Sequence, residues 1–389
     1  MNKPKIRFKG FEGEWNLPSI EDVFEIRNGY TPSKSVESYW IGGTIPWFRM
    51  EDIRASGGFL EDSIQHITPQ AVKNNGLFEK GSIIMATTAT IGVHAQLIAD
   101  SLANQQFTNF LIRKSLRERI IAKYVYYAFF GIDEWAIKNT NSGGLLSVNM
   151  PLLLKQPFFV PSLPEQRAIA SYFTSLDAQI AASTSRLSSL KQIKAASLLN
   201  MFPQKGETVP RVRFKGFQGE WKEIKLGEIF SVEIGEFVIK TKQKNNALYP
   251  VYNGGVSNTG FYDCYNQEGP KIIVSARGAN AGYVNYCTTD FWAGNSCYSI
   301  GAKNNDELKF FFYFLKRFQE IYMKNQYSAS IPSISKQQIL RTNLMYPSLP
   351  EQRAIASYFT ALDAQITLQR ERLEKLKQIK AACLEKMFA

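Results

Sequence analysis

Histidine and cysteine are scarce in this chain of 389 residues, which has two of the first and four of the second. The histidines, His66 and His94, leave little for a zinc site or a histidine-based catalytic centre, and we expect both to be solvated or core residues. The cysteines have no Cys-x-x-Cys spacing, so we expect neither a metal site nor a disulfide among them. They are Cys264, Cys287, Cys297 and Cys383.

Long apolar runs are also missing. The densest run, Phe310–Leu315, is far too short to span a bilayer. The N-terminus does not join a basic start to a long apolar stretch, so we expect no signal peptide. No segment has the basic amphipathic pattern that binds an anionic membrane surface. We therefore expect a soluble cytoplasmic protein without membrane contact.

Catalytic motifs are lacking too. The chain has no G-x-x-x-x-G-K-[ST] loop for nucleotide phosphates, and no Asn-Pro-Pro or Asp-Pro-Pro sequence with which amino-methyltransferases hold an exocyclic amine. We expect no catalytic residue, no metal ligand and no cofactor bound by this chain. These absences favour a binding protein over a fused nuclease or methyltransferase.

Positive charge, in contrast, is in excess. The chain has 46 Lys and Arg against 34 Asp and Glu, a formal net charge of +12. Such an excess attracts polyanions, most often nucleic acid. Hydrophobic residues make up 44% of the chain, which is enough to build packed cores.

Two stretches of the sequence occur twice. Pro161–Thr174 (PSLPEQRAIASYFT) is identical to Pro347–Thr360, at an offset of 186 residues. Arg7–Trp15 (RFKGFEGEW) recurs as Arg213–Trp221 (RFKGFQGEW), at an offset of 206. Fourteen consecutive identities do not arise by chance. Two units are too few and too long for a solenoid, so the repeat predicts a pseudo-twofold molecule.

The segments between these repeats differ from one another and predict α+β domains. Each has short β-prone runs that lead into glycine turns, as in Gly81–Gly92 and Gly269–Gly282. Each also has a late aromatic helix candidate, at Ile120–Phe130 and Glu307–Phe318. The predicted domains are 1–160, a central helix at 161–203, 204–346, and a C-terminal helix at 347–389.

The longer repeat predicts two equivalent helices of about 55 Å, over 165–201 and 351–387. Ser162 and Glu165, like Ser348 and Glu351, match a capping box, in which the glutamate reaches back to the first free amides. Apolar residues then follow at heptad-like spacing, which predicts an antiparallel coiled coil of the two helices. This seam consists of Ile169, Phe173, Leu176, Ile180, Leu187, Leu190, Ile355, Phe359, Leu362, Ile366, Leu373 and Leu376.

The whole arrangement resembles the specificity subunit of type I restriction–modification systems. Two variable domains are separated and followed by nearly identical helices that open with P-S-L-P-E-Q-R-A-I-A. Further motifs resemble features of the target-recognition domains of that family. They are Gly29–Ser33, Tyr39–Trp40, Ile45–Trp47, Thr90–Gly92, Ala103–Gln105 and Ser147–Met150, and in the second block Tyr252–Gly255 and Ser275–Gly278.

The resemblance implies a protein that reads a bipartite DNA target, one half with each domain, while the helices set the gap. It also implies two modification subunits, which bind S-adenosylmethionine and methylate adenine. Restriction subunits that use ATP and Mg²⁺ would join the larger assembly. A coiled-coil scaffold joining two protein-binding domains is the alternative, and it would not bind DNA in a sequence-dependent way.

DNA reading needs Arg and Lys for guanine and phosphate, and Asn and Gln for adenine. On this basis we predict DNA contacts in both variable domains. The candidates in the first are Thr31, Ser33, Lys34, Arg49, Thr88, Thr90, Gln105 and Gln106. The candidates in the second are Lys240, Lys242, Lys244, Asn253, Arg277, Asn280, Asn295 and Gln326.

Overall fold

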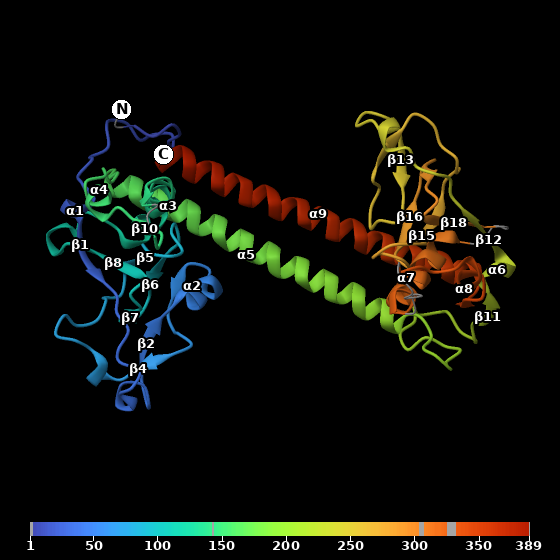
Figure 1. Cartoon of the computed structure of the whole chain (residues 1–389), viewed down its shortest axis with the longest axis horizontal. Helices are drawn as coiled ribbons and strands as arrows, with labels where there is room; N and C mark the ends of the chain where they lie inside the picture. The colour runs from blue at the N-terminus through green and yellow to red at the C-terminus, as the bar shows by residue number, and fades with distance from the viewer. Residues whose placement is uncertain (1–2, 142–143, 303–306, 325–331, 389) are drawn as a thin grey trace. The chain divides into compact units, whose positions relative to one another are not determined.

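The computed structural model describes residues 3–141, 144–302, 307–324 and 332–388. These residues form two compact units (Figure 1). Unit 1 combines residues 1–183 with 372–389, and unit 2 is the continuous segment 184–371. The division passes through both long helices, whereas the sequence-based boundaries treat each helix as a separate segment.

Unit 1 is built around a five-stranded sheet in the order β1-β8-β5-β6-β3. Neighbouring strands are antiparallel except β3, which is parallel to β6. The strands are β1 (Phe24–Asn28), β3 (Phe59–Leu60), β5 (Ile83–Ala86), β6 (His94–Leu97) and β8 (Phe107–Ile112). A smaller sheet has the order β4-β2-β7 and consists of β2 (Ile45–Phe48), β4 (His66–Ile67) and β7 (Leu102–Ala103).

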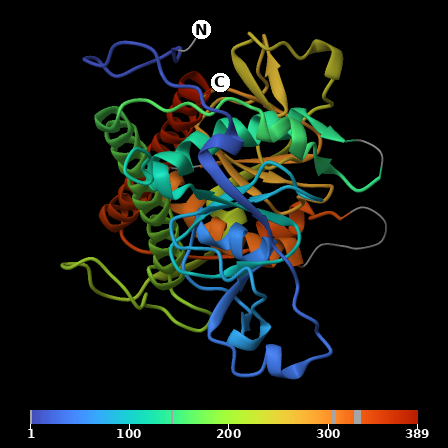
Figure 2. The same ribbon diagram turned by 90° about the vertical axis from the view of Figure 1, so that its left-hand side faces the viewer.

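Alternation along β5 gives unit 1 two cores. Ile83 and Met85 face helix α3 (Ala122–Lys138) and the first turns of α5 (Leu163–Asn200). Ile84 and Ala86 face the smaller sheet, because successive side chains of a strand point to opposite faces. The large sheet therefore lies between a helical layer and a small second sheet. Figure 2 views this unit with α5 and α9 side by side.

Unit 2 has a similar topology, with four described strands in its main sheet instead of five. Its main sheet has the order β12-β18-β15-β16, and its smaller sheet has the order β14-β13-β17. In both units the smaller sheet combines one parallel and one antiparallel pairing. The strands are β12 (Phe230–Ile234), β13 (Tyr249–Tyr252), β14 (Gly260–Tyr262), β15 (Lys271–Ser275), β16 (Val284–Cys287), β17 (Trp292–Ala293) and β18 (Cys297–Ala302). The helix equivalent to α3 is α7 (Leu308–Lys324).

Shorter elements complete the described chain. The helices are α1 (Ile20–Val23), α2 (Met50–Ser56), α4 (Met150–Leu154), α6 (Leu226–Ile229) and α8 (Lys336–Leu340). The remaining strands are β9 (Thr140–Asn141), β10 (Ser147–Val148), β11 (Lys222–Lys225) and β19 (Asn343–Tyr346). Single 3₁₀ turns lie at η1 (Glu37–Tyr39), η2 (Pro69–Ala71), η3 (Lys114–Leu116) and η4 (Lys240–Lys242).

The two predicted long helices are confirmed as α5 and α9 (Leu349–Phe388). Within unit 1, the start of α5 lies beside the end of α9, and Asp177 pairs with Lys380 at 2.6 Å. Within unit 2, the end of α5 lies beside the start of α9, and Lys194 pairs with Asp363 at 2.5 Å. The helices therefore run antiparallel in both units. Tyr127 and Tyr313 each donate to the nearby aspartate at 2.9 Å.

The residues assigned to the helix seam occupy two kinds of environment. Ile169, Phe173 and Leu176 belong to the core of unit 1, and Ile355 and Phe359 to that of unit 2. The first turns of each helix are thus part of a globular core. The other buried members of the set are Leu187, Leu190, Leu362, Ile366 and Leu373, while Ile180 and Leu376 are half-buried.

The predicted capping role of Glu165 and Glu351 is wrong. The Glu165 carboxylate instead accepts two hydrogen bonds from the Arg7 guanidinium, both 2.7 Å, and one of 3.2 Å from Trp15 Nε1. Glu351 accepts bonds of 2.7 and 2.8 Å from Arg213. A buried carboxylate is stabilised more by a bidentate guanidinium than by its own helix terminus. In each copy, the short and the long repeated sequences are therefore joined by one arginine–glutamate ion pair. We call Arg7–Glu165 and Arg213–Glu351 the clamps of units 1 and 2.

The following glutamine fixes the aromatic helix to the same place. Gln166 accepts from the Ile121 amide at 2.9 Å and donates to the Arg119 and Pro161 carbonyls, both at 2.9 Å. Beside the clamp, Asn16 and Val160 exchange backbone hydrogen bonds of 3.2 and 2.9 Å. Lys222 and Tyr346 are paired at the matching position of unit 2.

Candidate nucleic-acid interface

In unit 1, three connections meet where the large and small sheets join. We call residues 29–34, 87–90 and 104–106 the first loop cluster. The Gly29 amide donates to the Phe107 carbonyl at 2.8 Å, and the Thr87 amide to the Gln106 carbonyl at 2.9 Å. A Cβ on Gly29 would lie 2.2 Å from the Asn104 carbonyl oxygen, so only glycine permits this approach. The sheet framework thus holds three separate loops in one place.

The hairpin of β9 and β10 adds a fourth connection. The Ala89 amide donates to the Leu146 carbonyl at 2.8 Å, and the Val148 amide to the Thr87 carbonyl at 2.9 Å. Ala89 has a φ of 64°, the only positive value at a non-glycine residue in the described chain. Strained backbone of this kind persists where surrounding contacts impose it, often at binding sites.

The structure brings most of the first-domain candidates together. Thr31 Oγ1 donates to Gln105 Oε1 at 2.5 Å, and the side chains of Lys34 and Gln105 are exposed. Arg49 follows β2, whose last residue, Phe48, accepts from the Asn104 amide at 3.0 Å. Arg49 Nε lies 3.5 Å from Glu51 Oε2, and the Arg49 side chain is 27% exposed. Ser33 is exposed, and Thr88, Thr90 and Gln106 are half-buried.

Unit 2 forms an equivalent second loop cluster from residues 235–238, 253–255, 276–280 and 294–296. The Gly235 amide donates to the Cys297 carbonyl at 3.1 Å, and the Ala276 amide to the Ser296 carbonyl at 2.7 Å. Asn253 Oδ1 accepts from the Ser296 amide at 3.3 Å. The cluster therefore contains four of the second-domain candidates, of which Arg277 is exposed and the other three are half-buried. The four are Asn253, Arg277, Asn280 and Asn295.

The lysine candidates of unit 2 lie on the adjoining 3₁₀ turn and the residues after it. Lys240 and Lys242 are exposed, whereas Lys244 forms an ion pair with Asp263. The hydrogen bond to Asp263 raises the pKa of Lys244. Lys244 is thus less available to a phosphate than the other two. Gln326 lies outside the described residues.

Polar side chains behind the clusters hold the loops on the aromatic helices. In unit 1, His94 Nδ1 lies 2.5 Å from Asp133 Oδ2, and Nε2 lies 2.8 Å from the Tyr126 carbonyl. Both ring nitrogens thus lie within hydrogen-bonding distance of an oxygen. His94 is the first residue of β6, directly after the loop 87–93. It is a core residue that anchors this loop to α3.

In unit 2, Lys316 of α7 lies beside the start of β16. Its ammonium lies 4.0 Å from the centre of the Tyr283 ring and donates to Gln319 Oε1 at 2.7 Å. The same oxygen accepts from the Val284 amide at 3.2 Å. Burial, helped by the positive charge of Lys194, lowers the pKa of Lys316 to about 8.

Apolar side chains at the clusters are not among the predicted contacts, because those were selected for hydrogen-bonding groups. Leu145 and Leu146 beside the first cluster are 73% and 49% exposed, and Phe237 in the second is 72% exposed. The pattern could have signalled Phe237, since it is a bulky apolar residue two positions after a glycine in a polar, lysine-rich loop. Leu145 and Leu146 follow a Gly-Gly pair in the sequence, which is a comparable signal.

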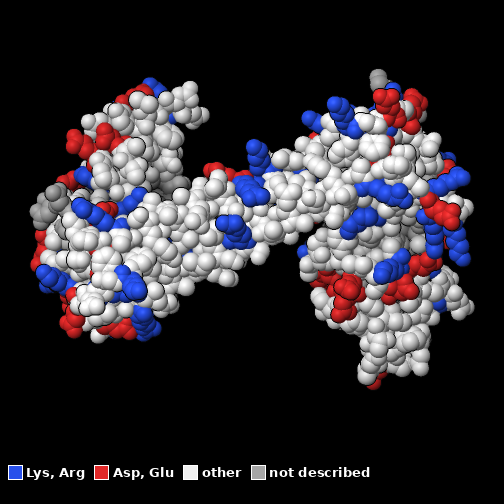
Figure 3. All heavy atoms as spheres, turned by 180° about the vertical axis from the view of Figure 1, so that it is seen from behind, with Lys and Arg blue, Asp and Glu red and all other residues white. Residues whose placement is uncertain are grey.

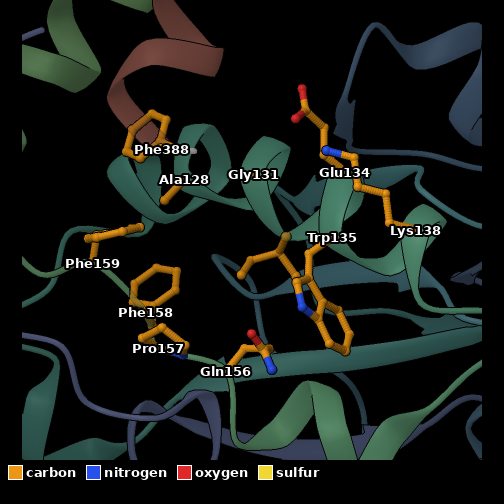
Figure 4. Close-up of a pocket in the computed structure, with 11 residues that line it drawn as sticks. Ala128, Gly131, Glu134, Trp135, Lys138, Gln156, Pro157, Phe158, Phe159 and Phe388 are labelled. Carbon is orange, nitrogen blue, oxygen red and sulfur yellow. The ribbon is translucent and has the colours of Figure 1, made fainter. Parts of the chain in front are cut away.

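Each unit also has a cleft beside its aromatic helix. In unit 1 it has a volume of about 300 Å³ and is lined by Trp135, Phe158, Phe159 and Phe388 (Figure 4). The cleft of unit 2, of about 870 Å³, is lined by Trp221, Phe314, Phe318 and Tyr322 among others.

Charged residues of both signs are scattered over the face of the molecule that Figure 3 shows. Figure 3 shows Lys and Arg over both units and on the long helices, interspersed with Asp and Glu. Among the described residues, no group of three His, Cys, Asp or Glu is placed to hold a metal ion. No helix within the described ranges is long and apolar enough to cross a membrane.

Comparison with known proteins identifies the family. The profile of the type I restriction modification DNA specificity domain matches residues 12–192 and again 218–378. The EcoprrI specificity subunit of Escherichia coli is 30% identical over 385 residues, which cover 96% of this chain and 92% of that protein. The MjaIX specificity subunit of Methanocaldococcus jannaschii is 24% identical with the same coverage.

Solved structures give the same fold. The S subunit of a type I system from M. genitalium has a TM-score of 0.67 at 19% identity, covering 100% of this chain and 99% of that one. A chain from a structure of type I complex assembly has a TM-score of 0.58 at 17% identity, covering 96% and 97%. This chain therefore belongs to the type I restriction–modification DNA specificity family and is a subunit that supplies DNA-sequence specificity without catalytic activity of its own.

Proposed function

We propose that each unit reads one half of a split duplex target through its loop cluster. The observation that carries this proposal is the repeated geometry. Two units of like topology gather polar side chains from several loops at the same place, although those loops differ in sequence. Arg, Lys, Asn and Gln in these loops suit phosphates and base edges. Different loops on one frame correspond to different half-sites.

We propose that the helix pair sets the gap between the half-sites. The helices have 38 and 40 residues, and each begins in one unit and ends in the other. At 1.5 Å per residue they are about 57 to 60 Å long, which compares with somewhat less than two turns of DNA. The paired Asp177–Lys380 and Asp363–Lys194 contacts fix the register of the two helices.

We further propose that two copies of a modification subunit bind the repeated helical surface. Ile193 and Ile379 are equivalent residues of the repeated KQIKAA segment and are 48% and 38% exposed. Packing within the chain does not require identity at exposed positions, whereas recognition of the same partner on both sides does. S-adenosylmethionine would bind to these subunits, and ATP and Mg²⁺ to restriction subunits of the larger assembly.

The methylation map of DNA from cells that carry this chain and its modification subunits tests the proposal. We expect adenine methylation in one bipartite motif with a fixed gap. Replacing residues 16–160 with the corresponding block of another family member should change one half of that motif only. A change in both halves, or in neither, would refute the assignment of one half-site to each unit.

A separate experiment tests the partner surface. Ile193→Asp and Ile379→Asp should each reduce the number of modification subunits that copurify from two to one, and the double variant should bind none. Leu199→Asp provides the matched control, because Leu199 is 53% exposed but is replaced by Glu385 in the second copy. Unchanged stoichiometry in the double variant would move the partner surface elsewhere.

A further inference from the structure

Phe237 lies in the second loop cluster with 72% of its side chain exposed, although its backbone is fixed on both sides. The Glu236 amide donates to the Ala293 carbonyl at 2.9 Å. The Ile239 amide donates to Tyr262 Oη at 2.7 Å, and this hydroxyl donates to the Ile239 carbonyl at 2.8 Å. The intervening Val238 is 7% exposed. The fold therefore presents the Phe237 ring to solvent on a rigid support, at the cost of leaving its apolar surface wet.

The position of Phe237 within the fold is that of Thr31 in unit 1. Gly29 and Gly235 end equivalent first strands, and a Cβ on either would lie 2.2 Å from a backbone oxygen of the equivalent loop. Thr31 and Phe237 both follow two residues later. Thr31 touches Gln105, a candidate for base contact. Phe237 thus has the same position in unit 2 as a candidate DNA-contacting residue of unit 1, with an apolar ring in place of the Thr31 hydroxyl.

The neighbours of Phe237 suit a nucleic-acid partner. The side chains of Val238 and Asn253 lie against Gly294, which places Asn253 and Asn295 next to the segment. Lys240 and Lys242 follow on the exposed 3₁₀ turn. Glu236 is the one acidic residue of the segment, and its backbone is tied to Ala293. An apolar side chain with lysines nearby is the pattern of residues that insert between base pairs while cations hold the phosphates.

We propose that Phe237 inserts its ring at one base step of the half-site read by unit 2, with Lys240 and Lys242 on the adjacent phosphates. The inference rests on the proposed function, because it requires that unit 2 reads DNA. Insertion of the ring would partly unstack one base step of the DNA. Unit 2 should therefore favour half-sites in which that base step unstacks easily. Unit 1 has a threonine at this position and reads its half-site without such a ring.

The test uses the full chain assembled with its modification subunits and duplexes of the motif found by methylation mapping. Phe237→Ala should weaken binding roughly tenfold, since the stacking of one base on an aromatic ring contributes that much. Phe237→Tyr should retain most of the affinity. Thymines at one step of the second half-site should react with permanganate in complexes of the parent chain and of Phe237→Tyr, and not in those of Phe237→Ala. Leu368→Ala, which removes a 68% exposed apolar side chain from α9, should change neither readout.

The outcomes separate the possible failures. If Phe237→Ala binds the duplex as tightly as the parent chain and keeps the permanganate signal, the insertion is refuted. If it loses modification subunits, Phe237 contacts protein, and the insertion is equally refuted. If scrambling the second half-site does not weaken binding of the parent chain, the proposed function of unit 2 itself fails.

Discussion

The Arg7 guanidinium and the Glu165 carboxylate, 158 residues apart, form two hydrogen bonds of 2.7 Å and thereby join the two repeated sequences of unit 1. The Glu165 side chain is 1% exposed and that of Arg7 17%. Hydrogen bonding to Glu165 raises the pKa of Arg7, which keeps it charged. Since removal of one partner leaves a buried charge, Arg7→Ala should destabilise unit 1 by about 3 kcal/mol.

Native-state hydrogen exchange measures this effect separately in each unit. Arg7→Ala should accelerate exchange in α3, and Arg213→Ala should do so in α7 instead. Combining Arg7→Met with Glu165→Gln should restore much of the protection, because no buried charge remains. Equal acceleration in both units by either single variant would contradict the clamp model.

Gly29→Ala should abolish recognition of the first half-site by unit 1. The added methyl group would lie 2.2 Å from the Asn104 carbonyl oxygen, so the first loop cluster must rearrange. We expect binding that no longer discriminates mutations in the first half-site but still discriminates those in the second. Gly235→Ala should have the reciprocal effect and serves as the control. The measurement is competition binding with duplexes altered in one half at a time.

Insertion of seven residues into α5 should change the gap and not the half-sites. Two turns of helix add about 10 Å, close to three base pairs of DNA. The inserted segment should preserve the seven-residue spacing of the seam. Methylation mapping should then show both half-sites unchanged, with a longer gap or no methylation. An unaltered gap would show that the helices do not set it.

Lys316 should give unit 2 a pH-dependent stability. Its pKa is about 8 in the folded chain, against an ordinary value of 10.5, because burial disfavours the ammonium. Between these values the unfolded chain binds more protons, so stability rises with pH through this window, by at most about 1.4 kcal/mol per pH unit. Below pH 8 the penalty is fully present and constant. Lys194 lowers this pKa, and Asp363 opposes the shift.

Urea unfolding of unit 2 between pH 7 and 10 tests this expectation. Lys316→Met should remove the rise and make the protein more stable at pH 7. Lys309→Met, another lysine of α7, is the control. A slope that survives in Lys316→Met would assign the effect to another group.

The repeated sequences predicted the frame of this molecule well, since α5 and α9 begin within two residues of the predicted starts. The Ser-x-x-Glu spacing did not reveal that Glu165 binds Arg7. A glutamate at this position of a helix can either take part in a capping box or form a long-range ion pair, and the local sequence does not distinguish the two. Both variable blocks were predicted to be α+β domains with a late aromatic helix, but their shared strand order was hidden, as they share few residues. Strand order depends on contacts such as β3 with β6, which lie far apart in sequence.

The candidate contacts were chosen by residue type, and type alone does not reveal location. Lys244 satisfied the criterion but is paired with Asp263. Phe237 failed it and yet lies in the second loop cluster. The gathering of Thr31 and Gln105, 74 positions apart, follows from the strand order and not from any local signal.

Asn16 and Val160 hold the two ends of the first variable block together, and Lys222 and Tyr346 do so for the second. The second block is 20 residues shorter, yet its ends meet in the same way. The first and last residues of each variable block therefore lie side by side, next to the repeated segments of the chain. Under the proposed function, exchange of one such block between family members would change one half-site and leave the constant residues, and any partner surface on them, unchanged.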